Sequence, residues 1–238
     1  MLNRFFTRNG MSYTNKVYAL APLAYWPMAE ASGATALDAS GNARNGAYTG
    51  VTLGQAGIGD GRSSASFDAS TSYNNVFGAS LSAAFNGAEG TLSIWCKVSG
   101  AGVWTDGVTR RVMYFLVNAS NRVGILKPTT SNEIDCLYVA GGVSLGAGKT
   151  SFSSVDWFHA GLTWSKAADQ MIFYINGIAI TPVSTGLGVF AGSLSSTQTL
   201  IGSLNTGAAA QVWSGLLAHA ALWNTPLSAG QIAALATV

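Results

Sequence analysis

The ten carboxylates are the side chains in this sequence best suited to acid–base chemistry, and they are scattered along its 238 residues. Glycoside hydrolysis, for example, needs two carboxyl groups roughly 5–9.5 Å apart. Only Glu133 and Asp135, in NEIDCLY, fall on one face of an expected strand. The pair has neither a third acid nor flanking aromatic subsites for a sugar, so we interpret it as solvated. His159 and His219 lie inside expected strands, with no motif that places a serine or cysteine beside them. We therefore predict that the chain is not an enzyme.

Aromatic residues in expected loops offer a second kind of chemistry, which is the binding of sugars. An aromatic ring can stack on one face of a sugar while a neighbouring polar group bonds the sugar hydroxyls. Five residues are candidate ligand contacts of this kind: Tyr48, Tyr73, Asn74, Trp104 and Asp106. The alternative for each aromatic ring is packing over the edge of the protein core, and the sequence leaves that alternative open.

An oxygen-rich loop, DASGNARNG, offers a third kind of chemistry, which is the binding of a hard cation. Asp38 and Asn42 are its candidate metal ligands. Calcium takes six to eight oxygen ligands, usually including carboxylates. The alternative is an Asx-turn loop, in which both side chains bond to their own backbone.

The two cysteines, Cys96 and Cys136, are too few for a disulfide framework. In TLSIWCKV, Cys96 shares a strand face with apolar residues, so we predict a buried free thiol. The spacing leaves a bridge between Cys96 and Cys136 open.

The chain carries very little charge. Charged residues make up 9% of the sequence, against roughly 25% in ordinary soluble domains. Twelve basic and ten acidic residues leave a net charge of +2, which gives no support for capture of nucleic acid or of an anionic membrane. No apolar run approaches the roughly 18 residues that span a bilayer. We expect part of the surface to be covered, in a homo-oligomer or a larger assembly.

The first 16 residues are expected to form a basic arm. They contain Arg4, Arg8 and Lys16, with no acid before Glu30. The segment MLNRFFTRNG has no continuous apolar core of the length that a signal peptide needs. Either Met1 or Met11 fits as the start.

Short β-branched and aromatic runs separated by Gly, Asn and Ser dominate the rest of the chain, which is typical of strands. Only the last segment, PLSAGQIAALATV, is expected to be helical, with Ser228 as its N-cap. Many strands and one terminal helix predict an all-β antiparallel sandwich. We expect it to form a single domain over residues 17–238.

Two local patterns refine this prediction. In YINGIAI, Asn176-Gly177 predicts a two-residue type I′ turn and therefore a tight hairpin. In RRVMYFLVN and QVWSGLLAHAALWN, apolar residues occupy both strand faces, and Leu217 and Trp223 are expected on the same one. A strand open to water on one side should alternate apolar with polar residues. The outer faces are therefore covered, by loops or by another subunit.

The order of these segments resembles the laminin-G-like, concanavalin A-like lectin/glucanase jelly roll found in bacterial surface proteins and phage structural proteins. The start, AYWPMAEASGATALDASGN, is similar to that family's first strand and loop. GTLSIWCKV is similar to its central Trp strand, and WFHAGLTWSKAADQMIFYINGIAI to its Trp-His and Asn-Gly meander. The resemblance runs from about Val17 to Ala236.

The resemblance also has implications for sites. It implies a structural Ca²⁺ near the Asp38 loop, held together with an acidic pair on the closing strand, but Ala218-His219 stands in that place. We therefore expect no cofactor, and no metal at Asp38 and Asn42. It also implies, for glucanases, a pattern such as Glu-x-Asp-x-x-Glu on one strand, of which only Glu133 and Asp135 match here.

These observations predict a non-catalytic structural or adhesive module. A phage virion component, such as a capsid decoration or tail appendage protein, fits the absent signal peptide, the sparse charge and the basic arm. We expect it to join the virion through its apolar outer faces and its arm. The alternative is a carbohydrate-binding lectin or adhesin domain of a bacterial surface protein, located outside the cell.

Overall fold

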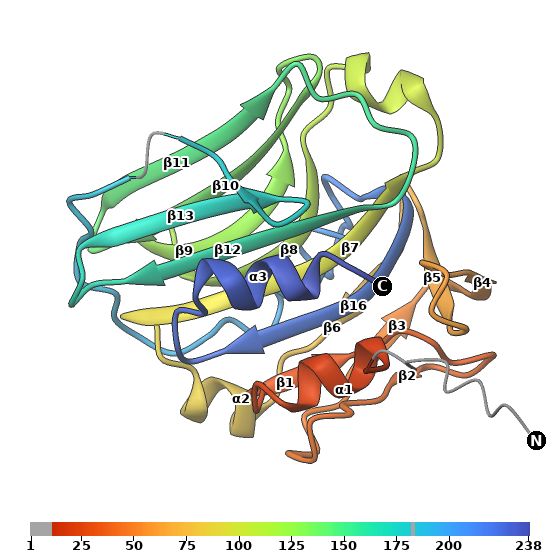
Figure 1. Cartoon of the computed structure of the whole chain (residues 1–238), viewed down its shortest axis with the longest axis horizontal. Coiled ribbons are helices and arrows are strands. Elements are labelled where there is room, and N and C mark those ends of the chain that lie inside the picture. Colours follow the sequence, from red (N-terminus) through yellow and green to blue (C-terminus); the bar gives the residue numbers. More distant parts are fainter. Residues whose placement is uncertain (1–10, 182–183) are drawn as a thin grey trace, which may run out of the picture.

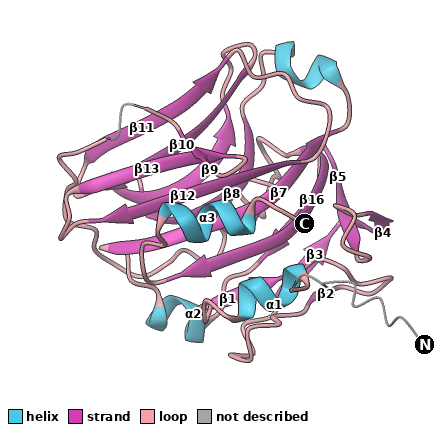
Figure 2. Cartoon of the chain, in the orientation of Figure 1, coloured by secondary structure: helices cyan, strands magenta, loops and turns pink. Residues whose placement is uncertain are grey.

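The protein is a sandwich of two antiparallel sheets, as the sequence predicts. The computed structural model describes residues 11–181 and 184–238. Figure 1 shows the two layers, and in Figure 2 strands dominate over a few short helices. Each sheet has eight strands. Sheet A has the order β14 (Ile178–Ala179), β13 (Gln170–Ile175), β12 (Phe158–Ser165), β7 (Glu89–Val98), β16 (Ser214–Trp223), β5 (Ser63–Asp68) and β4 (Thr52–Ala56), with β1 (Ala24–Trp26) paired to β16.

Sheet B faces sheet A across the core. It has the order β11 (Val143–Thr150), β10 (Glu133–Ala140), β9 (Asn121–Lys127), β8 (Arg110–Asn118), β15 (Thr199–Ile201), β6 (Tyr73–Asn75), β3 (Gly46–Thr49) and β2 (Thr35–Ala36). The helices are α1 (Tyr13–Tyr18), α2 (Ala79–Ala84), α3 (Ala229–Leu235) and the 3₁₀ turn η1 (Ala101–Thr105). Within the described ranges, no helix is both long and apolar enough to cross a membrane.

Large apolar side chains from both sheets fill the space between them. Trp26, Trp164 and Phe173 are fully buried there, as expected for inward positions of packed sheets. Cys96 and Cys136 are also buried in this core, and both are free thiols. Burial raises the pKa of both thiols, which keeps them protonated and unreactive.

A second apolar cluster covers the outer face of sheet A. Figure 1 shows α1 and α3 lying in front of this sheet, and Trp95, Trp223, Val17 and Ile232 are buried in the cluster. Helices of the same chain therefore cover this part of the outer face of sheet A. The arm expected over residues 1–16 is not extended in its described part, because α1 begins at Tyr13 and lies against the sheet. Residues 1–10, with Arg4 and Arg8, lie outside the described residues.

The strand β16 departs from simple alternation. Its register with β7 shifts between Ala218 and Ala221, and His219 has a φ of +54° there. This irregularity puts Leu217 in the core between the sheets and Trp223 on the outer face. The expectation that both share one face is therefore wrong, because an extra residue in a bulge moves all later side chains to the other face.

The Asn-Gly hairpin is confirmed. Asn176 and Gly177 have φ values of +50° and +78°, as a type I′ turn requires, and they join β13 to β14. The turn also touches α3, because a Cβ at Gly177 would lie 2.9 Å from Cα of Ala233.

We expect Gly177→Ala to lower the free energy of unfolding by about 2 kcal/mol, because backbone strain and a steric clash with α3 add together. Gly186→Ala is the matched control, since Gly186 has a φ of +83° but open space around it. Urea unfolding of both variants measures the difference. Equal losses would contradict a tight contact between the hairpin and α3.

Candidate functional site

The aromatic residues expected to contact sugars are mostly core residues. Trp104 is fully buried, packs edge-on against Phe152 at 5.2 Å between ring centroids, and donates from Nε1 to the carbonyl of Ser154 at 2.9 Å. Its ring closes one end of the core, so it offers no stacking surface. Tyr48 is also buried, and its hydroxyl donates to Glu30 at 2.8 Å.

Asn74 and Tyr73 point to opposite faces of β6. Asn74 is fully buried, and its side-chain amide has no hydrogen-bond partner among the described residues. It lies opposite Tyr48 in the sheet, on the inward side. Tyr73 is half-buried, so of these predicted contacts it alone keeps an accessible ring. The structure therefore does not bring the five predicted residues into one site.

Asp106 belongs to an ion-pair cluster. Its carboxylate lies 2.6 Å from Arg110 and 2.8 Å from Nζ of Lys127, which is fully buried. Burial opposes its ionisation, but the donors on Lys127, Val108 and Arg110 outweigh this effect and lower the pKa of Asp106. Asp106 therefore neutralises a buried cation instead of facing a ligand.

The Asp38 loop matches the Asx-turn alternative in part. One carboxylate oxygen of Asp38 accepts from the N–H groups of Tyr25 and Ser40, and the other accepts from that of Arg44. The side-chain amide of Asn42 donates to the carbonyl of Leu23 at 3.0 Å. These bonds engage both oxygens of Asp38, whereas Asn42 bonds the backbone of Leu23 through its nitrogen, so only Asp38 follows the Asx-turn alternative. Across the described ranges, no three His, Cys, Asp or Glu side chains form a group that could hold a metal.

The pair Glu133 and Asp135 lies on the outer face of sheet B. Asp135 is opposite Gly148 of β11, and a Cβ there would come within 2.6 Å of a Glu133 oxygen. Both carboxyl groups therefore lean over this glycine. Asp135 is half-buried, and one of its oxygens is buried without a partner among the described residues. Burial and the Glu133 carboxylate raise the pKa of Asp135 to about 7. The expectation of a freely solvated pair thus needs correction.

A polar groove of about 460 Å³ adjoins this pair, at the end of β10 and β11. Thr150, which lines the groove, lies directly opposite Glu133, so the carboxyl pair begins next to the groove. The Trp104 carbonyl accepts from the N–H of Asn132 at 2.9 Å and fixes the loop from below. The groove is lined by Thr130, Ser131, Asn132, Thr150, Ser151 and Ser153. We call it the hydroxyl groove.

Basic groups lie on the same face of sheet B, two strands from the acids. Arg111 and Asp135 are both opposite Leu126 of β9, so their side chains share a face. The Arg111 guanidinium covers the ring of Tyr114 at 4.5 Å and donates to Gln211. Carboxyl, guanidinium, hydroxyl and amide groups together can donate to and accept from a ligand rich in hydroxyls.

The hydroxyl groove was not predicted from the sequence. Its signal is present as two runs of hydroxyl and amide residues, TTSN at residues 129–132 and TSFSS at residues 150–154. Only the pairing of β10 with β11 brings these two runs together.

Comparisons with known proteins agree with the fold. A family model described as the concanavalin A-like lectin/glucanases superfamily, Laminin_G_3, matches residues 60–233. No curated protein matches the sequence. The structure is similar to domain 4 of AbnA, a GH43 extracellular arabinanase from Geobacillus stearothermophilus, in complex with arabinotriose. That likeness has a TM-score of 0.65 and 15% identity, over 90% of this chain and 97% of the other.

Two further solved structures share the fold at low identity. One is the CBM40 of the Ruminococcus gnavus IT-sialidase bound to α2,3-sialyllactose, with a TM-score of 0.58 and 11% identity over 73% of this chain and 96% of the other. The other is the binding domain of botulinum neurotoxin serotype D, with a TM-score of 0.58 and 13% identity, over 91% of this chain and 51% of that one.

We expect Asp106→Asn to lower the free energy of unfolding by about 2 kcal/mol at pH 7, because Lys127 stays buried without its anion. Urea unfolding measures this loss. The control is Asp156→Asn, at an exposed position, which should change stability little. Similar values for both variants would show that the ion cluster is not needed for stability.

The raised pKa of Asp135 makes the stability of the protein depend on pH. Its pKa rises from 3.8 to about 7 on folding, so the folded state binds the proton more tightly and stability falls as the pH rises between these values. We expect Asp135→Asn to raise the free energy of unfolding by about 1 kcal/mol at pH 8, allowing for solvent screening, with little change at pH 4. Denaturant titrations at both pH values test this, and an equal change at both would refute it.

Proposed function

Because the chain belongs to the concanavalin A-like lectin/glucanase superfamily, we propose that it is a non-catalytic carbohydrate-binding module. The ligand lies in the hydroxyl groove and extends over Glu133 and Asp135 onto the outer face of sheet B. The position of Glu133 opposite Thr150 of the groove carries this proposal, because it places carboxylate acceptors next to a row of hydroxyl and amide groups. AbnA domain 4 with arabinotriose and the CBM40 with sialyllactose support this ligand class.

The arrangement of the carboxyl groups supports binding without hydrolysis. Glu133 and Asp135 lean over the same residue, Gly148, from one strand, whereas a glycosidase holds its two carboxyl groups on either side of the scissile bond. The third position of the glucanase pattern is Tyr138, which is fully buried and donates to the carbonyl of Gly87 at 2.9 Å. No acid follows the pair on its own strand.

We place this module in a phage virion, as a decoration or tail appendage protein that contacts host glycans. The sparse charge of 9% and the basic residues Arg4 and Arg8 support that placement. A bacterial surface protein outside the cell is the alternative. Apolar outer faces give less support to an oligomer than the sequence implied, because α1 and α3 cover sheet A. Mass spectrometry of purified particles tests the placement, and absence of the chain from virions would refute it.

We expect a glycan array to identify a ligand, and Thr150→Val and Glu133→Gln each to weaken its binding at least about fivefold by calorimetry, because each removes one hydrogen-bonding group. Ser144→Ala is the matched control, since it removes an exposed hydroxyl from the other end of β11. Wild-type affinity in both groove variants would refute the site. Release of sugar by the wild type, lost in Glu133→Gln, would refute a non-catalytic role.

A further inference from the structure

The short helix α1 covers a polar and aromatic patch on the outer face of sheet A. The patch consists of Tyr25, Ser93, Trp95, His159 and His219, and each of these side chains is at most 7% exposed. They come from four strands, β1, β7, β12 and β16, that are neighbours in the sheet. We call it the covered patch. It shares no residue with the hydroxyl groove.

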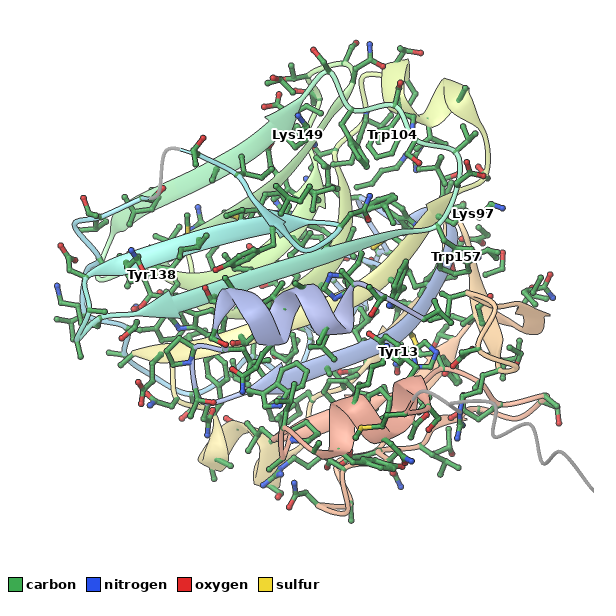
Figure 3. The ribbon with its side chains drawn as sticks, in the orientation of Figure 1. Tyr13, Lys97, Trp104, Tyr138, Lys149 and Trp157 are labelled. Carbon is green, nitrogen blue, oxygen red and sulfur yellow. The ribbon has the colours of Figure 1, made fainter. Side chains whose placement is uncertain are left out.

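The ring of Tyr13, on α1, fills the centre of the covered patch. Its centroid is 4.5 Å from that of His219 and 6.3 Å from that of Trp95, which it meets edge-on. Figure 3 shows Tyr13 between α1 and the sheet. The Tyr13 ring thus contacts both the indole of Trp95 and the imidazole of His219.

The fit of α1 leaves polar atoms unpaired. The hydroxyls of Tyr13 and Thr14, Nε1 of Trp95 and Nδ1 of His159 are all buried with no hydrogen-bond partner among the described residues. Buried polar groups in a settled protein interior are almost always paired. The Tyr13 hydroxyl lies near Trp95 and Ser93, but its contacts with them fall short of hydrogen-bond geometry, so α1 uses the hydrogen-bonding capacity of the covered patch only in part.

A left-handed backbone conformation at His219 places its ring against that of Tyr13. His219 lies in the bulge of β16 with a φ of +54°, a conformation that costs energy for a residue other than glycine. Its Nδ1 lies 2.6 Å from the hydroxyl of Tyr25, and its Nε2 lies 3.1 Å from the carboxylate of Asp60. Bulges of this kind redirect a side chain and are frequent beside binding sites.

The cover is small and has an opening beside it. α1 has six residues, of which only Tyr13, Thr14 and Val17 are buried. A helix this short has little stability of its own and depends on such contacts. A groove of about 280 Å³, lined by Ser12, Tyr13, Lys16 and Asp60 among others, leads to the edge of the patch.

We propose that the covered patch is a second binding site, for a neutral hydroxylated six-membered ring such as a hexopyranose, and that α1 closes it with Tyr13 in the place of that ring. Trp95, which meets the Tyr13 ring edge-on, and His219, which is tilted to it, supply the aromatic walls that contact the sugar. Ser93, Nε1 of Trp95, Nδ1 of His159 and the Asp60 carboxylate bond its hydroxyls. The ligand binds only when α1 has moved away, so its apparent affinity is reduced by the small open fraction. This site is independent of the hydroxyl groove.

Removal of the Tyr13 ring tests the proposal. Methyl α- and β-glycosides of glucose, galactose and mannose are titrated into the full chain and followed by NMR. We expect Tyr13→Ala to bind at least one of them about tenfold more tightly than the wild type, and Trp95→Ala in that background to abolish the gain. Asn15→Ala, at an exposed position of α1, should behave as the wild type. A cooperatively folded Tyr13→Ala variant with no gain would overturn the proposal.

Hydrogen exchange of the wild type provides a second test that needs no variant of the patch. With the methyl glycosides at about 0.1 M, above a millimolar dissociation constant, we expect faster exchange of the amides of residues 14–20, because bound sugar holds α1 open. Unchanged or slower exchange would overturn the proposal. The same acceleration is expected in Thr150→Val and Glu133→Gln, so failure of the hydroxyl groove and failure of this site can be told apart.

Discussion

The central strands of sheet A are apolar on both faces, so both faces must be shielded from water, and the rest of the structure provides this cover. The inner face is covered by sheet B, and the outer face by α1 and α3, which are far apart in sequence. Covering the outer face also brings the two ends of the described chain together, because Nζ of Lys16 reaches the carbonyl of Thr237 at 2.9 Å. Burial of a side chain such as Trp223, which would otherwise be exposed, contributes roughly 1.5–3 kcal/mol to the free energy of unfolding.

Much of the fold could be predicted from the sequence, because its signals are local. The Asn176-Gly177 turn, the inward Trp26 and the Ser228 cap depend on residues close to one another in the chain. The bulge at His219 has no such local signal, since an extra residue in one strand is defined only by its partner β7. The residues of β16 after the bulge, such as Leu222 and Trp223, therefore lie on the sheet faces opposite to those predicted from simple alternation.

The candidate site was predicted less well, and for a different reason. Trp104 and Tyr48 are aromatic residues next to polar ones in expected loops, but sequence does not say which way a loop side chain points. Both point inward, where burial of a large ring stabilises more than exposure does. The hydroxyl groove needs Ser131 and Ser151 to meet across the β10–β11 pair, which is a long-range contact. The Glu133–Asp135 pair was identified from its strand spacing, but its partial burial depends on Gly148 of the neighbouring strand.

The two ends of the described chain lie close together, which determines which face of the sandwich stays clear of them. Met11 and Val238 line the same small groove, on the side of sheet A that the helices cover. Both ends of the described chain therefore lie on the helix-covered side of sheet A, away from sheet B. The outer face of sheet B, which carries Glu133 and Asp135, is therefore the face of the sandwich that neither end of the described chain approaches.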